Sequence, residues 1–154
     1  MMYDQEMLKI ASHYAELFSG CTKVRVGAVI VKNDSVISLG TNRTFPSLCK
    51  TARGCLRVEK YGDNAKEHRR PSDCRAIHAE MDAISQHSGD IHGATIYVTR
   101  YPCEACARAI VAAGIRTVVY GRAQRASEET YRIFEDADIN CIWLMSYKEE
   151  DVTT

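Results

Sequence analysis

The chain has 154 residues, which fits one domain over residues 1–154, and folding at this size buries roughly 70% of the surface that the open chain exposes. Hydrophobic residues make up 45% of the sequence and charged residues 26%, and the formal net charge is zero, so the basic excess typical of nucleic-acid-binding proteins is absent. The sequence has neither the run of about 18 apolar residues that a membrane helix requires nor a secretory signal, so we expect a cytoplasmic protein.

The first predicted element is an amphipathic helix from Asp4 to Phe18, with Asp4 as its N-cap and apolar residues at three- and four-residue spacing. The next two are the strands of a β-hairpin, V-G-A-V-I-V (26–31) and V-I-S-L-G (36–40), joined by the turn K-N-D-S. The first of these strands is apolar enough to be buried on both faces. Residues 41–76 are polar and show no sustained period, and a loop of this length in a compact chain is usually functional or held by a metal.

From residue 78 onward, predicted helices and strands alternate. The helices are 78–88, 103–113 and 127–137, and the strands are 94–99, 117–120 and 140–144. Such alternation implies right-handed crossovers and parallel pairing, to which the hairpin adds antiparallel strands. We therefore expect an α/β fold, a three-layer α/β/α sandwich with a five-stranded mixed sheet.

The seven cysteines are many for a cytoplasmic protein, in which thiols stay reduced, and their odd number argues against a complete disulfide framework. Two of them, Cys103 and Cys106, follow Pro102 at the start of a predicted helix, where residues three apart share one face. The helix dipole favours thiolates there, and thiolate is the form that binds zinc. His78, also at a helix start, can supply a third ligand and leave the fourth position for water, as in catalytic zinc sites.

Glu80 follows His78 by two residues, and the two side chains can converge only near the start of the helix. Two thiolates neutralise Zn²⁺, so such a zinc should acidify its water less than an all-histidine site does, and a nearby base is needed. Glu80 can take a proton from the water and deliver it to a ring nitrogen or a departing amine. Alone, C-x-x-C is more often structural, redox-active or accidental, and H-x-E more often a solvated helix end. Together, in this order, they match the signature of zinc nucleobase deaminases.

The sequence resembles the cytidine deaminase-like superfamily, and within it most closely the deoxycytidylate (dCMP) deaminases. The motifs that carry the resemblance span about residues 5–145; they include V-G-A-V-I-V, G-T-N (40–42), C-R-A-I-H-A-E-M-D-A-I (74–84), G-A-T-I-Y-V-T (93–99), P-C-E-A-C (102–106) and A-G-I-R-T-V-V-Y (113–120). The resemblance implies that His78, Cys103 and Cys106 hold a catalytic zinc and that Glu80 shuttles protons.

The resemblance also implies contacts with a nucleotide. Asn42 would contact the sugar, although Asn is common at a strand end for backbone reasons alone. Lys23 and Arg25 are candidates for the 5′-phosphate, with solvated surface charge as the alternative. The sequence departs from the common family pattern G-Y-N-G-x-P by having Thr41 and Arg43, which puts regulation by dCTP and dTTP in doubt.

The resemblance further implies a second, structural zinc built from the end of the first helix and the long insertion. A closed four-ligand site would hold a polar loop that has little apolar surface to bury. The candidate pool is Cys21, Cys49, Cys55, His68 and Cys74, of which we favour Cys21, Cys49, His68 and Cys74. Free cysteines are the alternative.

Three functions remain open at this stage. The first is deamination of dCMP to dUMP, which would supply dUMP for dTMP synthesis, by a homo-oligomer, commonly a hexamer in this family. The second is an RNA-directed deaminase similar to the tRNA adenosine deaminases, or another nucleobase deaminase; the 35 residues between Asn42 and His78 and the neutral charge favour the mononucleotide. The third is a non-catalytic, zinc-stabilised binding module, which would have no need of Glu80.

Overall fold

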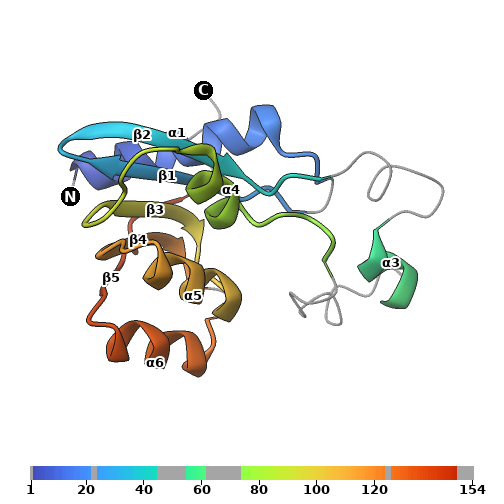
Figure 1. The fold of residues 1–154 in the computed structure, drawn as a ribbon. Coiled ribbons are helices and arrows are strands. Elements are labelled where there is room, and N and C mark those ends of the chain that lie inside the picture. The colour runs from blue at the N-terminus through green and yellow to red at the C-terminus, as the bar shows by residue number, and fades with distance from the viewer. Residues whose placement is uncertain (1, 22–23, 45–54, 62–73, 124–125, 149–154) are drawn as a thin grey trace.

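The computed structural model describes residues 2–21, 24–44, 55–61, 74–123 and 126–148. Its elements follow in chain order as α1 (Met2–Phe18), β1 (Gly27–Lys32), β2 (Ser35–Thr41), α3 (Leu56–Tyr61), α4 (Ala79–Gln86), β3 (Thr95–Arg100), α5 (Glu104–Ala112), β4 (Thr117–Arg122), α6 (Glu128–Asp136) and β5 (Asn140–Trp143). The five strands form one sheet in the order β2-β1-β3-β4-β5 (Figure 1).

The sheet is mixed, as the sequence predicted. β1 pairs antiparallel with both β2 and β3, whereas β3, β4 and β5 run parallel to one another. In the β1–β2 turn, Asn33 and Asp34 have φ values of 50° and 59°, the left-handed conformation that tight hairpin turns require and that Asn and Asp tolerate.

Helices cover both faces of the sheet, which confirms the three-layer prediction. On one face, Leu8 and Ala11 of α1 pack against Val29 of β1, Tyr97 of β3 and Val119 of β4. On the other face, α4, α5 and α6 cover a second core whose largest fully buried members are Ile30, Ile96, Val98, Ile110, Ile115, Val118 and Phe134. β1 lies between the two cores, and its residues from Gly27 to Val31 are all buried, as expected.

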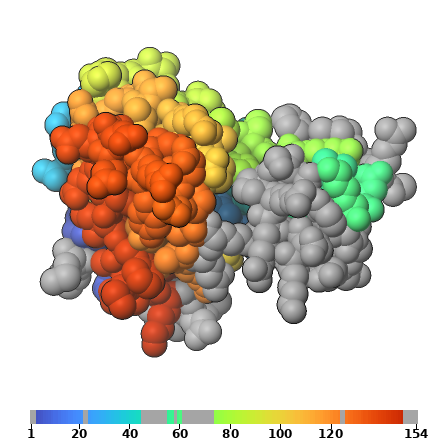
Figure 2. All heavy atoms as spheres, turned by 90° about the horizontal axis from the view of Figure 1, so that it is seen from below, coloured from blue at the N-terminus to red at the C-terminus, as the bar shows by residue number. Residues whose placement is uncertain are grey.

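Two local predictions are wrong. Helix α1 begins at Met2, so Asp4 lies in its first turn and does not cap it; the Asp4 carboxylate instead accepts a hydrogen bond from the Tyr97 hydroxyl at 2.9 Å. The segment expected to be a loop also contains the short helix α3, which lies to one side of the sheet, away from α6 (Figures 1 and 2). At six residues, α3 is too short to show a helical period in the sequence.

Within the described part of the chain, none of the helices has both the length and the apolar character of a membrane span.

Candidate active site

The site forms where two helices begin. His78 is the N-cap of α4 and Cys103 the N-cap of α5, and both have extended backbone angles, with ψ values of 153° and 168°. Neither side chain caps its own helix, so both are available for other contacts. Cys106 lies in the first turn of α5 and is fully buried. As predicted, the two thiols are presented from one turn at the positive end of a helix dipole.

The three side chains meet. The Nδ1 atom of His78 lies 3.4 Å from the Sγ atom of Cys103 and 3.4 Å from the Sγ atom of Cys106. Ligand atoms of all three residues lie within 4.8 Å of one another, and they form the one such group among the described residues. A tetrahedral zinc with bonds of about 2.3 Å to sulfur and about 2.0 Å to nitrogen separates these atoms by about 3.5 Å. The donor set therefore fits zinc in both chemistry and spacing.

Hydrogen bonds within the cluster set its protonation. The hydrogen bond from Cys106 lowers the pKa of Cys103 to about 4, and His78 adds to this effect. The same bond, with burial, raises the pKa of Cys106. The hydrogen bond with Cys103 raises the pKa of His78 above its ordinary value, although burial opposes this. Because zinc binds thiolate and neutral imidazole, binding of the metal must release the protons that these groups hold.

Glu80 lies beside this cluster and is 4% exposed. Burial raises the pKa of its carboxyl group, while the nearby His78 lowers it, and the side chain is close enough to Cys106 for a hydrogen bond. A buried carboxyl group with a raised pKa holds a proton more readily than an exposed one, which suits a group that must both accept and donate a proton. The arrangement can therefore pair an open metal position with a base.

Two of the three residues expected to contact the nucleotide, Asn42 and Arg25, have other partners in the structure. Asn42 is 9% exposed; its Oδ1 atom accepts hydrogen bonds from Ser19 Oγ at 2.6 Å and from the Val26 amide at 3.0 Å, and its Nδ2 atom donates to the Val24 carbonyl at 2.6 Å. Arg25 is exposed and donates to the Glu16 carbonyl at 3.1 Å. Lys23 lies outside the described residues. The sugar and phosphate contacts stay predictions.

The predicted second zinc site also stays a prediction. Cys49 and His68 lie outside the described residues. Cys21 and Cys74 are half-buried free thiols, and the Sγ atom of Cys21 accepts a hydrogen bond from the Val24 amide at 3.4 Å.

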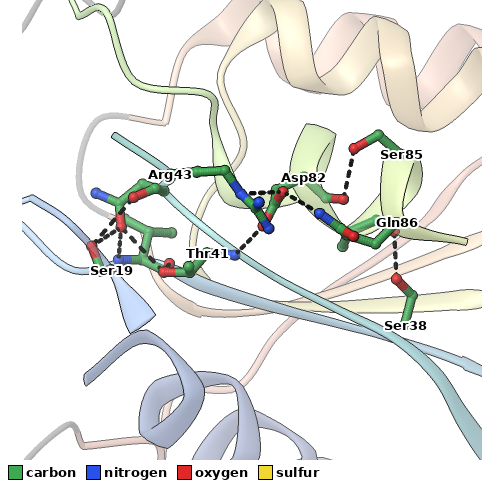
Figure 3. A network of polar contacts seen from close by, with 10 residues as sticks. Ser19, Ser38, Thr41, Arg43, Asp82, Ser85 and Gln86 are labelled. Carbon is green, nitrogen blue, oxygen red and sulfur yellow. Dashed lines mark hydrogen bonds and ion pairs between the residues drawn. The ribbon is translucent and has the colours of Figure 1, made fainter. Parts of the chain in front are cut away.

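Sequence reasoning missed one charged pair next to the site. Asp82 of α4 is 2% exposed and forms an ion pair with Arg43, in which Arg43 Nε lies 3.0 Å from Asp82 Oδ1 (Figure 3). Asp82 lies in the quoted motif 74–84 and Arg43 directly follows G-T-N, but nothing in their spacing indicates that they meet, because the contact depends on how α4 lies against the end of β2. The one sequence signal was the departure from the family pattern at Arg43.

Comparison with known proteins places these features in context. The family model described as "Cytidine and deoxycytidylate deaminase zinc-binding region" matches residues 1–122. The chain is 37% identical over 127 residues to the deoxycytidylate deaminase of Mycobacterium phage D29, a match that covers 77% of this chain and 93% of the phage protein. It is 35% identical over 151 residues to the deoxycytidylate deaminase of Saccharomyces cerevisiae, which covers 96% of this chain and 46% of the yeast protein.

Some relatives are much longer than this chain. It is 36% identical over 132 residues to ComE operon protein 2 of Bacillus subtilis, a match that covers 83% of this chain and 64% of that protein. It spans less than half of the yeast protein. Among solved structures, the dCMP deaminase of cyanophage S-TIM5 in complex with dCMP and dUMP matches with a TM-score of 0.71 and 23% identity, covering 93% of this chain and 97% of that one. This likeness supports the fold.

Proposed function

The chain belongs to the cytidine and deoxycytidylate deaminase family, and we propose that it hydrolytically deaminates a pyrimidine nucleotide, converting dCMP to dUMP and so supplying dUMP for dTMP synthesis. The observation that carries the proposal is the meeting of His78, Cys103 and Cys106 beside the buried carboxyl group of Glu80. A structural zinc site has no use for such a carboxylate, so this arrangement favours an enzyme over a zinc-stabilised binding module. The names of the phage and yeast relatives support dCMP as the substrate.

In this proposal His78, Cys103 and Cys106 hold one zinc ion. A zinc bound there supplies a Lewis acid that makes a water molecule easier to deprotonate. Glu80 accepts a proton from the water that attacks C4 of the cytosine ring, and donates it to the N3 atom. The hydroxyl group now on C4 then gives its proton to Glu80, which delivers it to the amino nitrogen as the C4–N bond breaks, so that ammonia leaves and C4 retains the oxygen as a carbonyl group. The raised pKa of Glu80 suits a group that must be charged at one step and neutral at the next.

The proposal has further parts that rest on family membership. They are a single catalytic domain over residues 1–154, a homo-oligomer, commonly a hexamer, in the cytoplasm, and Asn42, Lys23 and Arg25 as contacts for the sugar and phosphate. A second, structural zinc held by Cys21, Cys49, His68 and Cys74 is also part of the proposal and also rests on family membership.

RNA is the main alternative substrate, because G-T-N-R at residues 40–43 resembles a motif of tRNA adenosine deaminases. The guanidinium of Arg43 is paired with the buried carboxylate of Asp82, which takes up its charge. This pairing weakens the case for an RNA-contacting arginine at this position.

The test is an ultraviolet assay of the purified protein against dCMP, CMP, dCTP, deoxycytidine and a tRNA anticodon stem. We expect the highest kcat/KM for dCMP. Faster turnover of the anticodon stem would mean that the substrate is RNA and not a mononucleotide. No turnover of any of the five compounds by zinc-loaded protein would contradict a deaminase.

A further inference from the structure

Asp82 is a buried carboxylate on the active-site helix that the deamination mechanism does not use. Its Oδ2 atom accepts hydrogen bonds from the Thr41 amide at 3.1 Å and from Arg43 Nη2 at 3.4 Å. Its Oδ1 atom lies 3.0 Å from Arg43 Nε and accepts a hydrogen bond from Gln86 Nε2 at 3.1 Å (Figure 3). Apart from Gln86, every one of these partners lies at the end of β2. Asp82 therefore joins α4 to the chain that leaves β2.

Arg43 holds the chain a second time, through its backbone. Its amide donates to the Ile77 carbonyl and its carbonyl accepts from the Ile77 amide, both at 2.9 Å. Ile77 comes directly before His78, and Asp82 follows Glu80 by two residues. Arg43 thus binds the chain on both sides of the segment that carries His78 and Glu80. We call the contacts among Arg43, Ile77 and Asp82 the Arg43 clamp.

Close packing between β2 and α4 adds to the clamp. A Cβ atom on Gly40 would overlap the backbone of Ala79 and Ala83, so the helix lies directly on the strand. Ser38 Oγ donates a hydrogen bond to the Ala83 carbonyl at 2.5 Å. The first turn of α4 is therefore held from the strand side as well as from the side of Arg43.

We propose that Arg43 and Asp82 are positioning residues for the reaction, which together hold the first turn of α4 so that the Glu80 carboxylate lies at proton-transfer distance from its partners. The inference rests on the proposed function. Proton transfer requires heavy atoms about 2.6–3.2 Å apart, and a displacement of about 1 Å can cost about 100-fold in rate. Arg43 supplies the positive charge that neutralises the Asp82 carboxylate. The Asp82 side chain is 2% exposed and that of Arg43 is 48% exposed, so the buried partner depends on this charge. Its loss leaves a buried carboxylate with neutral donors only, which favours movement of α4 toward solvent.

The experiment compares Arg43→Gln, Asp82→Asn and the double variant with the parent chain, by kcat and KM for dCMP, zinc per chain and the thermal unfolding midpoint. Arg132→Gln is the matched control, because it removes an arginine from an exposed ion pair with Glu128 on α6. We expect each clamp variant to lower kcat at least about tenfold, with KM changed less than about twofold and zinc content unchanged. The double variant should be no worse than the more impaired single one, because both break the same contact. Arg43→Lys, which keeps the charge, should recover part of kcat.

Three results would overturn the inference: parental kcat in both single variants, a loss of kcat that only follows loss of zinc or of folded protein, or a raised KM with kcat unchanged. The last would make Arg43 a substrate contact. If the parent chain itself failed to deaminate dCMP, the proposed function would fall first. Amide hydrogen exchange at the start of α4 would still test the clamp: exchange at the Asp82 amide, which donates to the His78 carbonyl at 2.9 Å, should be faster in Arg43→Gln than in Arg132→Gln, and equal rates would reject it.

Discussion

The Nδ1 atom of His78 and the Sγ atom of Cys106 lie 3.4 Å apart, although 28 residues separate them in the chain. The two residues come from the starts of α4 and α5. Both helices lie on the same face of the sheet, and β3 runs through Tyr101 and Pro102 directly into the start of α5. The metal-binding donors therefore meet because the fold brings two helix N-termini together.

Replacement of Glu80 by Gln tests the proton shuttle. The amide keeps nearly the same shape but cannot accept a proton, so we expect zinc and fold to be retained while kcat for dCMP falls by about 10²–10⁴-fold. Steady-state kinetics with metal analysis measures both. Glu129→Gln, at an exposed position of α6, is the control and should keep the parental rate. Parental turnover in Glu80→Gln would remove the shuttle from the mechanism.

Replacement of Cys106 by Ser tests the metal site. Serine does not supply the thiolate that zinc prefers, so we expect the catalytic zinc to be lost, deamination to stop, and the unfolding midpoint to fall, since bound metal stabilises the folded state. Cys141→Ser is the matched control, because Cys141 is a half-buried free cysteine on β5 that packs against the core and is not part of the cluster. Equal zinc content in the two variants, by metal analysis of the dialysed proteins, would contradict the ligand assignment.

Replacement of Gly40 by Ala tests how closely α4 must lie on β2. The added Cβ would overlap the backbone of Ala79 and Ala83, which cannot move as a side chain can, so we expect unfolding free energy to fall by about 1–3 kcal/mol and kcat to fall with it. In the control, Gly89→Ala, the nearest atoms belong to the side chain of His87, which can turn away. Denaturant unfolding of both variants checks this, and equal stability would mean that α4 can shift without cost.

Replacement of Cys74 by Ser tests the second metal. We expect about two zinc ions per chain in the parent and about one in the variant, with the catalytic site intact, because a closed structural site needs all four ligands. Mass spectrometry under native conditions gives the count. One zinc in the parent chain would remove the second site from the account and leave Cys74 as a free thiol.

Much of this architecture could be predicted because it depends on local patterns. The apolar run at 26–31 indicated a strand buried on both faces, and the alternation after residue 78 indicated the parallel half of the sheet; the structure has both. Boundaries moved by one or two residues, as with α4, expected over 78–88 and found over Ala79–Gln86. His78, Cys103 and Cys106 could be grouped because zinc needs a small set of ligand types at restricted spacings.

The rest depends on contacts between distant segments. The pairing of Asp82 with Arg43 joins residues 39 positions apart, and its formation depends on the way α4 lies against β2. A structural role for Asn42 was an open alternative because of its position at a strand end, but its partners Ser19, Val24 and Val26 lie 16 to 23 positions earlier and could not be named from the sequence. Asp4 was expected as a cap because a polar residue before an apolar period usually is one, but the helix begins two residues earlier.

The central claim is that this chain deaminates dCMP with the aid of zinc at the cluster of His78, Cys103 and Cys106. The most direct measurement follows dUMP and ammonia formation from dCMP by the purified protein before chelation, after removal of zinc, and after zinc is restored. We predict equimolar dUMP and ammonia from the native protein, loss of activity with the metal, and its return with about one equivalent of zinc at this site. Turnover that is unchanged in zinc-free protein, or no turnover at full zinc loading, would contradict the account.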